Sequence, residues 1–253
     1  MKLRSLRAFV GLIVTSAVLL PFSLSAQQSL HWGYEGREGP ANWSKLDPAN
    51  ATCAIGRRQS PIDIRAAKSS ALPALRFDYK AVPLNVIDNG HTIQVNYAPG
   101  SVLSVGEKTY VLKQFHFHHP SEEYINGHGY DMVAHLVHED AAGNLAVVAV
   151  LFKTGQANAL MDQIWKNIPR EKNKAVDVLS TTINARNLLP SDLGYFTFSG
   201  SLTTPPCSEG VTWFVLKSAT SLSPSQLAVF AKLYPNNARP IQPTNGREIL
   251  ETK

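Results

Sequence analysis

The run "NLAVVAVLFK" at residues 144–153 places the strongest constraint on the fold of this chain. It is nearly all apolar and rich in β-branched residues, which favour extended backbone. A strand with one face in water would alternate between polar and apolar residues. An unbroken apolar run is instead typical of a strand that is buried on both faces. The chain is therefore expected to build a sheet whose two faces are both covered.

Further strand-like runs surround this segment. The sequence "EDAAGN" has the composition of a hairpin turn, and it connects residues 131–140 to residues 144–153. Other runs with alternating or β-branched residues occupy 84–97, 108–119 and 210–217. Together these runs predict a single domain that is mainly β with minor α, built around a large, mostly antiparallel sheet.

Two short helices are expected beside the sheet. Residues 156–168 place apolar side chains on one side of a helix that ends before Pro169. Residues 224–233 follow Ser223 as the N-cap, with proline at the first helical position and Gln226 at the capping-box position. The low helical content agrees with a mainly β domain.

The first residues of the chain have the layout of a secretory signal peptide. Three basic residues precede an apolar stretch, and small residues follow near position 26. The apolar stretch is shorter than the roughly 20 residues that span a bilayer. We therefore predict a cleaved leader over 1–26 and a mature domain over 27–253, with no stable membrane insertion after cleavage. Leu24 is not a small residue, so the exact bond stays open.

Removal of the leader leaves a nearly neutral protein. The leader holds three of the 24 basic residues and no acidic residue, so 21 basic residues face 19 acidic ones in the mature chain. The mature chain has no run of lysine and arginine that would form a basic stripe for nucleic acid, so binding to nucleic acid is not expected. Export favours a disulfide between the two cysteines, Cys53 and Cys207. These features indicate the periplasm of a Gram-negative bacterium, with secretion or an organelle lumen as alternatives.

Histidine is concentrated in the run "QFHFHHP" at residues 114–120. In a strand, residues two apart face the same side, so His116 and His118 project together and the phenylalanines face the other way. If residues 131–140 form the neighbouring strand, His135 lies opposite them. Three neutral imidazoles with one open position are typical of catalytic zinc. The alternative is that these histidines line a hydrated strand face.

Six motifs follow one another along the mature chain: "HWGY" (31–34), "RQSPIDI" (58–64), "NGH" (89–91), "QFHFHHPSE" (114–122), "AHLVH" (134–138) and "GSLTTPPCSEGVTWFVL" (200–216). In content and order they resemble the α-class carbonic anhydrases of the bacterial, exported branch, and the two cysteines resemble the disulfide pair of that branch. The resemblance implies a large, twisted sheet with zinc at the bottom of a conical cleft. It also implies the reversible hydration of CO2 to bicarbonate and a proton.

The resemblance assigns His116, His118 and His135 as zinc ligands, with Gln114 as a partner of the first. It implies that a zinc-bound hydroxide attacks CO2, because the bound water has a pKa near 7, a value for which carbonic anhydrase is itself the reference case. Fast turnover then needs a proton acceptor with a pKa near 7, which histidine can provide. His91 resembles the histidine that shuttles this proton.

Further roles follow from the same resemblance. Thr203 resembles the threonine that accepts a hydrogen bond from the hydroxide, and Glu122 resembles the carboxylate that accepts the threonine's proton. Glu123 competes for that role by position, and Thr204 is expected to hold substrate or solvent. The apolar wall that receives CO2 is implied to be Val137, Val147, Leu202 and Trp213, whose alternative role is ordinary core.

One position departs from the family. Its members often carry glutamate two residues before the third zinc histidine, where the carboxylate holds that imidazole, but Val133 stands there in this chain. Loss of such a partner can cost 10–100-fold in metal affinity or activity. His135 is therefore expected to be held by another group or to be held more loosely.

Two other classes of protein share some of these features with a zinc enzyme that acts on CO2 and bicarbonate. Family members that have lost a zinc histidine act as non-catalytic binding domains, but all three histidines are present here. A cupin-like metal enzyme also uses two histidines one residue apart, but it would normally add a glutamate ligand and would lack "SLTTPP". The expected state is a monomer or a homodimer.

Overall fold

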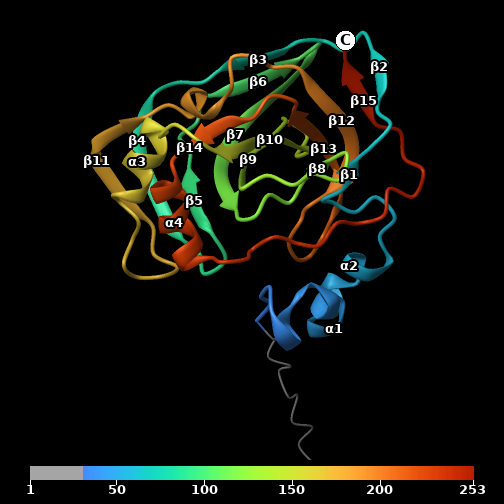
Figure 1. Cartoon of the computed structure of the whole chain (residues 1–253), viewed down its shortest axis with the longest axis horizontal. Coiled ribbons are helices and arrows are strands. Elements are labelled where there is room, and N and C mark those ends of the chain that lie inside the picture. The colour runs from blue at the N-terminus through green and yellow to red at the C-terminus, as the bar shows by residue number, and fades with distance from the viewer. Residues whose placement is uncertain (1–30) are drawn as a thin grey trace, which may run out of the picture.

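The computed structural model describes residues 31–253, which form a large curved β-sheet with short helices at its margins (Figure 1). Within this range one sheet has 13 strands, in the order β11-β4-β5-β7-β9-β10-β13-β12-β15-β2 along its main path. In addition, β6 joins β3 to β7, and β14 pairs with β10. The prediction of a mainly β fold with a mostly antiparallel sheet is confirmed.

The strands of this sheet are β2 (Lys68–Ser70), β3 (Leu75–Asp78), β4 (Val82–Asp88), β5 (Ile93–Asn96), β6 (Val102–Val105), β7 (Lys108–His118), β9 (Met132–Glu139), β10 (Leu145–Thr154), β11 (Val176–Ile183), β12 (Tyr195–Ser201), β13 (Glu209–Leu216), β14 (Thr220–Leu222) and β15 (Leu250–Thr252). A separate parallel pair consists of β1 (Asp63–Ile64) and β8 (Tyr124–Ile125). The parallel pairs of the large sheet are β10 with β13, β10 with β14, and β15 with β2.

The centre of the sheet is formed by β7, β9 and β10. The apolar run of β10 is buried from Ala146 to Phe152, as its composition predicted. The turn before it closes an antiparallel hairpin with β9, in which Asp140 accepts hydrogen bonds from the backbone of Ala142 and Asn144. On the other side, β9 pairs antiparallel with β7, so that His116 and His135 lie opposite each other.

Two expected elements differ from the structure. The run 84–97 is not one strand: β4 and β5 form a hairpin, and Gly90 turns the chain between them with φ of 85°. The expected helix over 156–168 is shorter, because α3 (Ala159–Trp165) starts only after Asn158, whose side chain caps it. The helix over 224–233 is confirmed as α4 (Pro224–Leu233), with the predicted capping box.

The two faces of the central strands have different coverings. On one face α3 and α4 lie side by side (Figure 1), and the rings of Trp165 and Phe230 pack against Phe117. The opposite face carries the histidines and a second apolar cluster that includes Val133, Val147 and Trp213. The predicted alternation of phenylalanine and histidine along β7 is therefore present.

The N-terminal part of the described range consists of short helical turns below the sheet in Figure 1. They are α1 (Trp43–Leu46), α2 (Thr52–Ile55) and the 3-10 turns Gly36–Glu38, Pro40–Asn42 and Pro48–Asn50. A fourth 3-10 turn, Ala185–Leu188, lies between β11 and β12.

A disulfide joins Cys53 to Cys207, as predicted. Among residues 31–253, no helix is both long and apolar enough to cross a membrane. The predicted leader over 1–26 lies outside the described residues.

Candidate metal centre and catalytic pocket

The pairing of β7 with β9 brings three imidazoles together. His116 and His118 share a face of β7, and His135 projects from the position of β9 opposite His116. Their candidate ligand atoms all lie within 4.8 Å of one another. Such a spacing allows three nitrogens to reach one ion at the 2.0–2.1 Å that is usual for zinc.

One ring nitrogen of each imidazole lies within hydrogen-bond distance of an oxygen atom. Nδ1 of His116 lies 2.9 Å from Oε1 of Gln114, and Nδ1 of His118 lies 2.7 Å from the backbone oxygen of Asn237. Nε2 of His135 lies 2.9 Å from Oε1 of Glu123. Because amide, carbonyl and carboxylate oxygens accept hydrogen bonds, these ring nitrogens donate and the other nitrogen of each ring keeps a free lone pair.

The donor set fits a zinc ion. Nε2 of His118 is buried and has no hydrogen-bond partner among residues 31–253, which is costly for a polar atom unless a ligand satisfies it. Burial lowers the pKa of His118 to about 4 and that of His135 to about 3, and it lowers the pKa of His116 well below its usual value. All three rings are therefore neutral at neutral pH, which is the form that binds metal.

Two adjacent carboxyl groups are buried beside the histidines. Burial raises the pKa of Glu122 to about 7 and that of Glu123 to about 8. Oε1 of Glu122 accepts a hydrogen bond of 2.7 Å from the backbone nitrogen of Arg239. A dication held by the histidines would lower both pKa values and favour the ionised carboxylates.

Thr203 and Thr204 follow the end of β12 and lie at the same site. Thr203 is buried, and its hydroxyl is among the groups that lower the pKa of Glu122, although no hydrogen bond of ordinary length joins the two side chains. Thr204 lines a cavity of about 130 Å³ that His116 and His118 also line. The loop that carries both threonines ends at the disulfide-bonded Cys207.

The apolar residues expected to receive CO2 lie near one another in the sheet. In the strand register, Gln114 is opposite Val137, Val137 is opposite Val147, and Val147 is opposite Trp213. Leu202 packs against the same cluster, and the ring of Trp213 meets that of His135 edge-on at 4.9 Å. These four residues are not among those that line the 130 Å³ cavity in the described chain, so their role as its wall stays a prediction.

His91 lies in the turn between β4 and β5 and lines two hollows, as Trp32 and Tyr34 also do. It lines the cavity above the histidines and also an outer hollow of about 360 Å³ that contains His31 and Tyr234. Its ring stacks on Trp32 at 3.6 Å between centroids. Burial, followed by the charges of His31 and Lys172, lowers the pKa of His91 to about 4.

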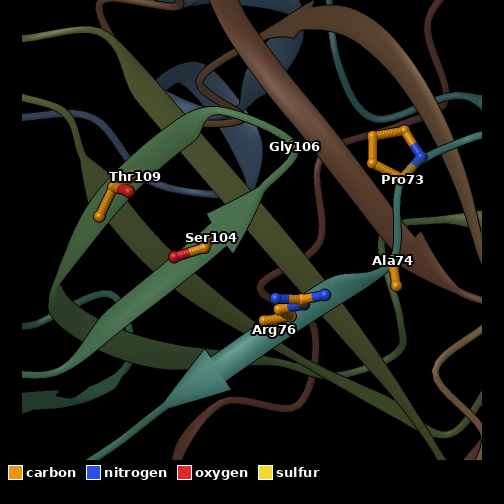
Figure 2. A pocket seen from close by; sticks show the side chains of 6 residues that line it. All are labelled: Pro73, Ala74, Arg76, Ser104, Gly106 and Thr109. Carbon is orange, nitrogen blue, oxygen red and sulfur yellow. The ribbon is translucent and has the colours of Figure 1, made fainter.

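A different hollow, of about 410 Å³, lies over β3, β6 and the start of β7 (Figure 2). Arg76 is the one charged side chain among its six lining residues, and none of the residues predicted for the site lines it. Its chemistry does not match the predicted reaction, so the three-histidine site is the stronger candidate.

Several residues at the site were missed from the sequence. Asn237 supplies its backbone oxygen to His118, and its side-chain amide donates to the backbone oxygens of His91 and Phe117. Arg239 supplies the backbone N–H that contacts Glu122. The backbone oxygen of Asn237 and the backbone N–H of Arg239 leave no signature in residue type, so no sequence motif could have identified these two contacts.

The fold and the site define a β-sheet protein with a buried centre of three neutral imidazoles, suited to a catalytic metal. Residues 38–253 match the sequence family described as eukaryotic-type carbonic anhydrase. A carbonic anhydrase of Pectobacterium carotovorum is 45% identical over 230 residues, which cover 90% of this chain and 94% of that protein. The chain belongs to the carbonic anhydrase family, in its α class.

Solved structures agree with this assignment. A hyperthermostable carbonic anhydrase from an active hydrothermal vent chimney superposes with a TM-score of 0.85 at 45% identity. The match covers 88% of this chain and 100% of that one. The α-carbonic anhydrase of Thermovibrio ammonificans, solved with the inhibitor sulfanilamide, gives a TM-score of 0.83 at 42% identity, over 88% and 99% of the two chains.

Proposed function

We propose that this chain is a zinc-dependent carbonic anhydrase that interconverts CO2 and bicarbonate. The observation that carries the proposal is the convergence of His116, His118 and His135, each with one ring nitrogen already engaged by an oxygen. Zinc bound to three neutral imidazoles supplies a water of pKa near 7 and hence a nucleophile at neutral pH, carbonic anhydrase being the reference case for this value. The protein's own residues then orient the reactants and remove the proton.

Thr203 and Glu122 are assigned the orientation of the nucleophile. A threonine hydroxyl has one proton, and here that proton would be donated to the carboxylate. The hydroxyl can then only accept a hydrogen bond from a neighbouring O–H group, which fixes the orientation of that group. Glu122 is fixed by the Arg239 backbone N–H, which leaves its other oxygen for the hydroxyl. Thr203 is among the groups that lower the pKa of Glu122 and is not among those that act on Glu123, so Glu122 suits this role better.

The substrate side of the site is assigned to apolar side chains and Thr204. CO2 has no net dipole and is weakly hydrated, so an apolar surface beside the metal favours it over water. Val137, Val147 and Trp213 occupy neighbouring positions on β9, β10 and β13, and Leu202 packs beside them. Thr204 adds a hydroxyl that can hold substrate or solvent.

His91 is assigned the transfer of the proton to solvent. Its position between the inner cavity and the outer hollow lets it exchange a proton with either side. We expect His91→Ala to lower kcat in weak buffer, and added imidazole to restore much of the loss, because a soluble base then replaces the missing acceptor. An unchanged kcat in weak buffer would remove this role.

We also propose that the protein is exported. The predicted leader over 1–26 and the disulfide fit a bacterial periplasm, where disulfides persist. In this assignment the mature catalytic domain is 27–253.

The test is stopped-flow CO2 hydration by the purified mature protein, with zinc content measured on the same sample. Fast hydration that is lost on chelation and restored by zinc is the expected result. A chain that binds one zinc but does not hydrate CO2 would instead be a binding module.

A further inference from the structure

In the carbonic anhydrases that this chain resembles, a glutamate two residues before the third zinc histidine often holds that imidazole. The same position is apolar in this chain. Val133 lies two residues before His135 on the same face of β9, and in the strand register it is opposite His118 and Leu151. Its side chain is fully buried in the apolar cluster on this face. No acceptor for a hydrogen bond from His135 can come from this position.

A carboxylate reaches the same imidazole from a different element. Glu123 lies between the end of β7 and the start of β8, and its side chain is 0% exposed. Its Oε1 is 2.9 Å from Nε2 of His135, which is the distance of a charge-assisted hydrogen bond. With Nε2 occupied as a donor, the lone pair of Nδ1 is the one left to bind metal.

The backbone around Glu123 is fixed by hydrogen bonds. The Ser121 hydroxyl donates to the backbone oxygen of Glu123 at 3.0 Å, and the same hydroxyl accepts from the backbone nitrogen of Tyr130 at 2.7 Å. The next residue, Tyr124, donates its backbone N–H to the oxygen of Ile62. A side chain with such an anchored backbone can orient a partner ring at little cost in entropy.

We propose that Glu123 is the positioning residue of His135 and replaces the missing strand carboxylate. The inference rests on the proposed zinc site. Glu123 is also the acidic member of the three acceptors, since Gln114 and Asn237 offer neutral oxygens to the other two imidazoles. A carboxylate makes its imidazole the more basic ligand, so His135 is the ring on which metal retention depends most.

One other use of the same atoms is possible. Oxygens of Glu122 and Glu123 and a nitrogen of His135 lie within 4.8 Å of one another and could form a second cation site. In that case Nε2 of His135 would be a ligand rather than a hydrogen-bond donor. The two arrangements differ in zinc stoichiometry and in the presence of the Nε2 proton.

The experiment compares zinc release from four variants into a colour-forming chelator. Glu123→Ala is expected to release zinc about 10–100-fold faster than the wild type, and Glu123→Gln less so because its amide oxygen still accepts. Val133→Ala is the matched control: it removes side-chain volume beside the same ring but no acceptor, so its release rate should stay within about twofold. The double variant Glu123→Ala with Val133→Glu should recover most of the loss, since it returns a carboxylate to the strand position.

A second readout does not depend on release or activity. In the zinc-loaded wild type, nitrogen-15 NMR of the histidine rings should show a proton on Nε2 of His135, and its resonance should move in Glu123→Gln. Equal release rates in Glu123→Ala and the wild type, or two zinc ions per wild-type chain, would overturn the inference. A wild type that binds no zinc would instead overturn the proposed function.

Discussion

Replacing Trp32 by alanine is expected to raise the pKa of His91 and to speed proton transfer at neutral pH. The His91 ring lies flat on the indole, with 3.6 Å between centroids and an interplanar angle of 6°. Burial is the main cause that lowers the pKa of His91 from 6.5 to about 4, and the charges of His31 and Lys172 lower it further. Removal of the indole exposes one face of the His91 ring to water. This weakens the desolvation that is the main cause of its low pKa.

The size of the effect follows from these values. At pH 7, about one His91 in a thousand is protonated with a pKa of about 4, against about one in four with a pKa of 6.5. An acceptor that lies about 3 units below a donor of pKa near 7 also slows the uphill transfer by up to about 1000-fold. Because His31 and Lys172 remain, we expect the variant's pKa to lie between about 5 and 6.

The assay is an NMR titration of the His91 ring, identified by its absence from spectra of His91→Ala. His31→Gln is the control for the charge effect and should raise the pKa by less than Trp32→Ala. In weakly buffered CO2 hydration at pH 7, Trp32→Ala should show a higher kcat, by up to about 10–100-fold for a rise of about 1–2 pKa units. A wild-type pKa near 6.5, or one that Trp32→Ala does not move, would refute the reasoning. A fall in kcat would show that the stacked ring is the productive position.

Three shorter predictions test other parts of the molecule. Thr203→Ala should lower kcat/KM about 100-fold at unchanged zinc content, measured by stopped-flow, and Thr203→Ser should recover most of the loss because it keeps the hydroxyl. Burial lowers the pKa of His138 from 6.5 to about 4, so the unfolded state binds this proton first as pH falls, and His138 alone should account for a loss of about 3 kcal/mol of stability across that interval. His138→Gln should lack this loss in urea unfolding at pH 7 and 4.5, with both proteins in the same metal state. Replacing Cys53 and Cys207 by serine should lower the unfolding free energy by up to about 5 kcal/mol, since the bridge spans 154 residues, and should make unfolding insensitive to reductant.

The central strands and the histidine triad were predictable because they depend on a period of two. Once β7 and β9 pair, the parity that places His116 and His118 on one face also fixes the face of His135. The same rule placed the phenylalanines of β7 against the helices, where Phe117 meets Trp165 and Phe230. Local chemistry was enough for α4, whose capping box needs only the residues around Ser223.

Contacts between distant segments were not predictable in the same way. The stack of Trp32 on His91 joins two residues from separate loops, and nothing in either loop encodes the other. The run 84–97 has alternating and β-branched residues on both sides of "DNG", which favours one strand, but the turn at Gly90 divides it into two. The sequence showed that the strand position before His135 is apolar, but it did not show that Glu123 comes within 2.9 Å of that ring.

The difference between Val133 and Glu123 shows which property of the site has to be kept. A zinc histidine needs an acceptor at the ring nitrogen that faces away from the metal, and it does not matter which backbone segment carries that acceptor. Around this centre the acceptors come from β7 itself, from the loop before β8, and from a backbone carbonyl near the C-terminus. If Glu123 holds His135 as proposed, loss of the acceptor on the strand is tolerable because a loop reaches the same ring atom. Substitution at Glu123 should be costly in this chain and mild in a relative that keeps the strand glutamate, where the residue at the Glu123 position has no imidazole to hold.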